Sequence, residues 1–98
     1  MDVRSMLIKM LRQLVEDMLV IQQQGAGYYS CVSIARRYNK LLGQARILLG
    51  DNGLASTFQD IEEIEPKDPG EKMKVVQGIR IEIGQLIVLL DNMGGEPA

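Results

Sequence analysis

Residues 31–49, CVSIARRYNKLLGQARILL, decide how this 98-residue chain folds. Apolar and small side chains recur there every three or four residues, which is the spacing of one face of an α-helix. The face consists of Cys31, Ala35, Tyr38, Leu42, Ala45 and Leu49. Because Gly50 interrupts the pattern, we expect a helix over residues 28–49 that buries this face.

A second helix is predicted upstream, over residues 2–23. Asp2 is a suitable N-cap, and Gly25-Ala26-Gly27 provides the turn that follows the helix. The apolar stripe of this helix consists of Leu7, Leu11, Leu14, Met18 and Ile21. Polar and charged residues lie on the opposite side, and the apolar face is broad, so the helix is predicted to touch more than one neighbour.

The third predicted helix covers residues 69–92, although part of it also fits a strand. Asp68-Pro69-Gly70-Glu71 is a helix-start pattern, with an N-cap, a proline in the first turn and an acid soon after. The helical stripe consists of Val76, Ile79, Ile83, Leu86, Leu90 and Met93. Residues 79–83 also alternate as a strand would, and Gln77-Gly78 fits a hairpin turn. We favour the helix because the stripe extends over six positions.

Together these segments predict one all-α domain over residues 1–93. We expect an antiparallel three-helix, up-down-up bundle. The connector, residues 51–68, is predicted to add one short helical turn that Ser56 or Thr57 caps and Pro66 ends. Residues 94–98 are expected to form a flexible tail.

The composition excludes several classes of chemistry. The chain has no His and only one Cys, Cys31, so it cannot form a catalytic triad, a disulfide within the chain or a cysteine-rich zinc site. We therefore expect no enzymatic activity, no cofactor and no metal. A lone thiol suits a reducing compartment, and the longest apolar run, residues 86–90, is far too short to cross a bilayer. We expect a cytoplasmic protein.

Two motifs resemble binding sites but lack essential residues. Gly25-Ala26-Gly27 begins like a dinucleotide loop but has no third glycine and follows a helix rather than a strand. A calcium loop counted from Asp51 has Gly53 and Ala55 where ligands are needed. We interpret the acidic residues 60–65 as a solvated loop, and the sequence leaves open whether it binds a cation.

The helices carry more apolar side chains than a small three-helix core can cover. We therefore expect self-association, with a two-fold dimer as the first choice and a protein partner as a further option. The predicted interface consists of Ile8, Val15, Leu19, Ile81, Val88 and Leu89. Residues 1–50 hold seven basic and three acidic side chains, and residues 51–98 hold four and ten. Attraction between these halves, within or between copies, would add specificity. The predicted function is that of an adaptor, an inhibitor or an assembly subunit.

The alternative hypothesis is a DNA-binding regulator that uses residues 31–54. Residues 32–38 would form one short helix, 39–42 a turn and 43–50 a recognition helix, with residues 79–83 as a wing strand. This division resembles helix-turn-helix regulators in the fragments Ile34-Ala35-Arg36 and Asn52-Gly53-Leu54. The nucleic-acid contacts would come from Arg36, Arg37, Lys40, Gln44 and Arg46. The unbroken stripe over residues 31–49 and the acidic net charge both count against this alternative.

Overall fold

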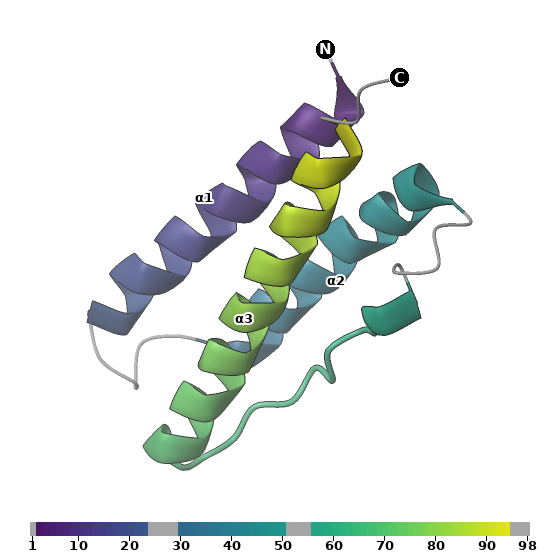
Figure 1. Cartoon of the computed structure of the whole chain (residues 1–98). Helices are drawn as coiled ribbons and strands as arrows, with labels where there is room; N and C mark the ends of the chain where they lie inside the picture. Colours follow the sequence, from purple (N-terminus) through teal and green to yellow (C-terminus); the bar gives the residue numbers. More distant parts are fainter. Residues whose placement is uncertain (1, 24–29, 51–55, 95–98) are drawn as a thin grey trace.

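The computed structural model describes residues 2–23, 30–50 and 56–94. Three helices, α1 (Val3–Gln23), α2 (Cys31–Leu49) and α3 (Pro69–Gly94), pack against one another (Figure 1). The predicted all-helical fold is confirmed, with boundaries that differ by up to three residues. The predicted tail beyond Gly94 and the turn at residues 24–29 lie outside the described residues.

The helix ends follow from local chemistry. At the start of α3, the Asp68 carboxylate accepts a hydrogen bond from the Glu71 N–H (3.0 Å), as the sequence predicts for an N-cap. At the start of α2, the Ser30 hydroxyl accepts from the Ser33 N–H (3.2 Å). α2 ends at Gly50, which has a φ of 58° and donates its N–H to the Arg46 carbonyl (3.0 Å).

The core lies along the axis between the three helices. All six residues of the predicted α2 face are buried, and five of the six α3 residues are buried as well. From α1 the core receives Leu7, Ile8, Leu11, Leu14 and Met18. The side chains of Ile21 and Met93 lie outside the description. Tyr38 is fully buried and is the largest side chain in the centre of the core.

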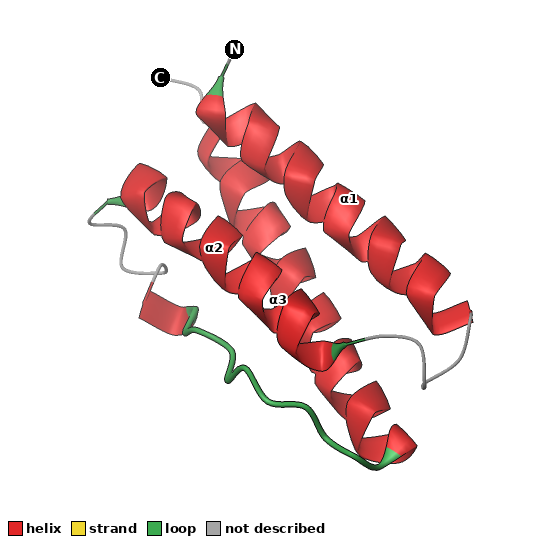
Figure 2. Ribbon diagram, turned by 180° about the vertical axis from the view of Figure 1, so that it is seen from behind, coloured by secondary structure: helices red, strands yellow, loops and turns green. Residues whose placement is uncertain are grey.

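The predicted up-down-up order is wrong in one respect: α2 and α3 run in the same direction, and α1 runs opposite to both (Figures 1 and 2). The start of α2 lies beside the start of α3, where the Cys31 thiol is 3.7 Å from the Lys72 carbonyl. The α1 start lies beside the end of α3, where Arg4 Nη1 donates to the Leu90 carbonyl (3.2 Å).

The connector explains this topology. Of the connector residues that the structure describes, 56–57 form a helical turn and 58–66 are non-helical. The short helix predicted to continue to Pro66 therefore ends before Phe58. Residues 58–68, if extended, span roughly 35 Å, which exceeds the roughly 28 Å length of α2. The chain thus returns along the whole bundle before α3 begins (Figure 2).

Two alternatives from the sequence are excluded by the helices themselves. Residues 79–83 belong to α3, so neither a hairpin nor a wing strand exists there. α2 continues unbroken through residues 39–42, where a helix-turn-helix motif needs its turn. Neither the strand pattern nor the helix-turn-helix division forms, because the longer helical stripe buries more apolar surface than a few alternating residues can.

Two glycines provide a test of the helix geometry. A Cβ built at Gly43, within α2, meets nothing within 4 Å, whereas one built at Gly70 lies 2.9 Å from Asp68 Oδ2. We expect Gly43→Ala to raise the free energy of unfolding by about 1 kcal/mol, because alanine is the better helix former. Gly70→Ala should give no such gain, since it displaces the capping carboxylate. Urea unfolding followed by circular dichroism measures both, and equal gains would contradict this geometry.

Candidate interaction surface

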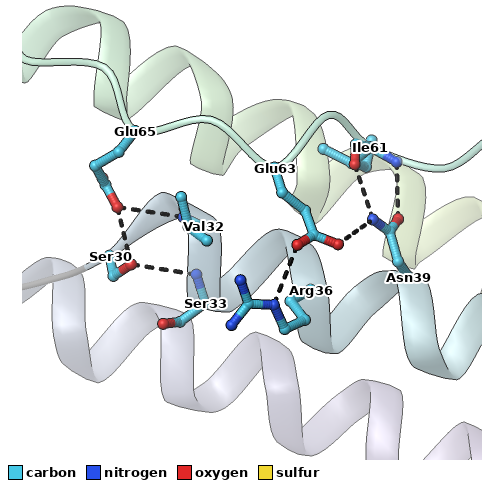
Figure 3. Close-up of polar contacts among 8 residues, drawn as sticks. All are labelled: Ser30, Val32, Ser33, Arg36, Asn39, Ile61, Glu63 and Glu65. Atoms are coloured by element: carbon cyan, nitrogen blue, oxygen red, sulfur yellow. Dashed lines mark hydrogen bonds and ion pairs between the residues drawn. The ribbon is translucent and has the colours of Figure 1, made fainter.

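A single carboxylate, that of Glu65, binds the connector to the start of α2 (Figure 3). Its Oε1 accepts the Ser30 hydroxyl (2.8 Å) and the Val32 N–H (3.3 Å). Its Oε2 accepts the Cys31 N–H (3.0 Å) and lies 3.2 Å from Lys72 Nζ on α3. One side chain therefore joins the connector, α2 and α3.

These bonds change the electrostatics of the junction. The hydrogen bond from the Cys31 N–H, with those from Ser30 and Val32 and the Lys72 ammonium, lowers the pKa of Glu65 to about 2, although desolvation opposes the shift. Burial, followed by the negative charge of Glu65, raises the pKa of the Cys31 thiol. The thiol is buried, and its raised pKa favours the neutral form.

Three more α2 side chains hold the connector along its length. Asn39 pairs with the Ile61 backbone, donating to its carbonyl and accepting from its N–H, each at 2.8 Å. Arg36 Nε donates to Glu63 Oε1 at 3.1 Å (Figure 3). Arg46 donates to the Asp60 carboxylate and to the Phe58 carbonyl, both at 2.7 Å. Residues 58–65 therefore form a strap over α2, although the sequence indicated their acidic part, residues 60–65, as a solvated loop.

This pairing accounts for two of the five predicted nucleic-acid contacts. Arg36 and Arg46 face acids of their own chain, so the strap already neutralises them. Arg37, Lys40 and Gln44 are exposed, and they form no hydrogen bond or ion pair with the described residues. The attraction between the basic and acidic halves of the sequence thus acts within one chain at these positions.

The strap and α3 enclose two shallow apolar hollows. The larger, with a volume of about 500 Å³, is lined by Ile61, Ile64, Val75, Gly78, Ile79 and Ile81 and also by the charged residues Glu62, Lys74 and Glu82. The other, of about 340 Å³, is lined by Thr57, Phe58, Gln85, Val88, Leu89 and Asn92. Both hollows open beside the side of α3 that points away from the core.

That side of α3, here called the outer face, carries no charge over three turns. It consists of Gln77, Gly78, Ile81, Gly84, Gln85 and Val88, all of them exposed. Ile81 is 64% exposed and Val88 is 56% exposed. The exposed sides of α1 and α2, in contrast, carry Lys9, Arg12, Arg36 and Lys40. The outer face of α3 thus combines two exposed apolar side chains with an absence of charge over residues 77–88.

The six predicted interface residues do not form one surface. Ile8 is only 5% exposed and belongs to the core, because α1 turns it toward α3. Val15 and Leu89 are half-buried against the core, and Leu19 is exposed on α1. Only Ile81 and Val88 share one exposed helix face. The sequence signal for all six was a position outside the main apolar stripe, which does not distinguish exposed residues such as Ile81 from buried ones such as Ile8.

The described residues contain no group of three Cys, Asp or Glu side chains that could hold a metal ion. Burial and the charge of Glu82 raise the pKa of Tyr38 to about 12, so its phenol stays neutral in the core. None of the three helices combines the length and apolar character needed to span a bilayer.

The chain was compared with models of protein families, with curated proteins and with solved structures, and none of the three comparisons gave a match. Function must therefore be inferred from the surface described above.

The Glu65 junction predicts how stability depends on pH. Its folded pKa lies below its ordinary value, so the carboxylate stabilises the fold fully above about pH 4.5, and this contribution is lost as the pH falls toward 2. Glu65→Gln should lower the free energy of unfolding at pH 7 by about 1 kcal/mol, as loss of a helix cap does. It should also flatten the pH profile between 4.5 and 2.

Glu62→Gln is the matched control, because it removes one charge from the same segment without touching α2. Unfolding by urea at a series of pH values compares the three proteins. If the free energy of unfolding of Glu65→Gln still falls between pH 4.5 and 2 as it does in the wild type, another carboxylate controls acid unfolding.

Proposed function

We propose that this chain is a non-catalytic helical-bundle protein that works through protein–protein contacts and associates with itself. The proposal is supported chiefly by the uncharged outer face of α3, with Ile81 and Val88 exposed at its centre. Exposed apolar side chains in one continuous group are typical of surfaces that another protein covers.

The position of this face favours an assembly role. The outer face lies on a 26-residue helix that is held to α1 by Arg4 and Arg12 and to the strap by Lys72. A rigid helix presents a fixed contact surface, which lowers the entropy lost on association. The buried free thiol of Cys31 suits a reducing compartment, and we place the protein in the cytoplasm.

Self-association is tested with two isoleucine-to-glutamate variants. Ile81→Glu should raise the dissociation constant of the assembly at least about tenfold, because burying a carboxylate at a contact is unfavourable. Ile47→Glu is the matched control, since Ile47 is 77% exposed but lies on α2. Sedimentation equilibrium measures both, with circular dichroism to confirm folding.

Two results would count against this proposal. A wild-type chain that sediments as a monomer at every concentration would exclude self-association. A stable assembly that Ile81→Glu leaves intact and Ile47→Glu disrupts would place the contact on α2 instead.

A further inference from the structure

We infer that the second copy packs antiparallel on the outer face of α3, with the two-fold axis passing beside Gly84 and Gln85. This inference rests on the proposed self-association and adds its geometry. The occupant of the face is a second copy of this chain because the face complements itself in shape and in charge, as a two-fold contact requires.

The apolar residues are placed symmetrically about the inferred axis. Ile81 lies three residues before Gly84, and Val88 lies three residues after Gln85. When two such helices pack antiparallel about this point, Ile81 of each copy meets Val88 of the other. Gln77 and Asn92 are likewise each seven residues from the centre, so amide faces amide at both ends.

Gly84 gives the pair room at the axis. A Cβ added at Gly84 would meet nothing within 4 Å, so no side chain covers the Gly84 backbone on the outer side of the helix. A glycine inside an exposed helix weakens that helix by about 1 kcal/mol relative to alanine. Its position at the centre of the symmetric pattern lets the two backbones approach closely where side chains would otherwise keep them apart.

The charges beside the face are complementary under the same symmetry. Arg80 and Asp91 are eleven residues apart, about three helical turns, so both lie on the side of α3 nearest α1. Asp91 confirms this side, since its carboxylate lies 3.4 Å from Arg12 of α1. In an antiparallel two-fold pair, the side of α3 nearest α1 in one copy lies next to the same side of α3 in the other copy. This arrangement brings Arg80 of each copy close to Asp91 of the other.

No like charges oppose each other in this register. Between Val75 and Leu90, α3 has only one other charged residue, Glu82, on the side nearest the strap. The residue that opposes Glu82 on that side, Leu89, is apolar. The ion pairs thus lie on the side of the contact nearest α1. On the side nearest the strap, the two hollows extend the contact surface.

The first test reverses one charge. Arg80→Glu should weaken dimerisation about fivefold, because Arg80 of each copy would then face Asp91 of the other with like charge. Asp91 itself also pairs with Arg12 of its own chain, so the matched control is Arg37→Glu, which reverses an exposed basic charge on α2. A dimer that Arg80→Glu weakens no more than Arg37→Glu would overturn the register.

The second test measures proximity at the axis. Gly84→Cys should form a disulfide-linked dimer on mild oxidation on the order of ten times faster than Gln44→Cys, because a disulfide needs Cα atoms within about 7 Å. Gln44 is exposed on α2 and reports random collision, and the buried Cys31 of the wild type gives the background.

The two proposals fail in different ways. A wild-type monomer in sedimentation would remove the proposed self-association and the inferred geometry together. A wild-type dimer in which Gly84→Cys links no faster than Gln44→Cys would overturn the geometry alone. Gly84→Ala gives a further comparison. If this substitution weakens dimerisation and at the same time raises the stability of the folded monomer, the result supports close packing at the axis.

Discussion

The structure depends on the contact between the Glu65 carboxylate and the start of α2. Because α2 and α3 run in the same direction, their N-termini lie side by side, and the positive ends of two helix dipoles meet. Such an arrangement needs negative charge at that end. The connector supplies it through Glu65 at α2 and Asp68 at α3, only three residues apart. The acidic character of the connector is therefore a requirement of the parallel arrangement.

Most of the secondary structure could be predicted, because it depends on local patterns. The apolar stripes located all three helices, and the Asp68-Pro69 pair marked the start of α3 to the residue. The relative direction of α2 and α3 could not be predicted in this way. It depends on whether residues 58–68 extend or coil, and that depends on contacts such as Asn39 with Ile61, which are distant in sequence.

The candidate surface was predicted only in part for the same reason. Ile81 and Val88 lie opposite the buried stripe of α3, so periodicity alone indicates their exposure. Ile8 lies at the edge of its stripe, where burial depends on how closely α3 approaches α1. The neutralisation of Arg36 and Arg46 by the strap has no local signature, because their partners follow them by 27 and 14 residues. Distant pairing thus decides which basic side chains remain available to another molecule.

The returning connector also has a consequence for the order in which the chain folds. α1 and α2 are close in sequence and antiparallel, so their contacts form after closure of a short loop. α3 can dock only after residues 58–68 have returned along the bundle, which makes its contacts the most distant in sequence. We therefore expect an α1–α2 hairpin to form early and α3 to join it late. The helix that carries the proposed contact surface would then be the last to be completed, and association between copies would follow folding rather than guide it.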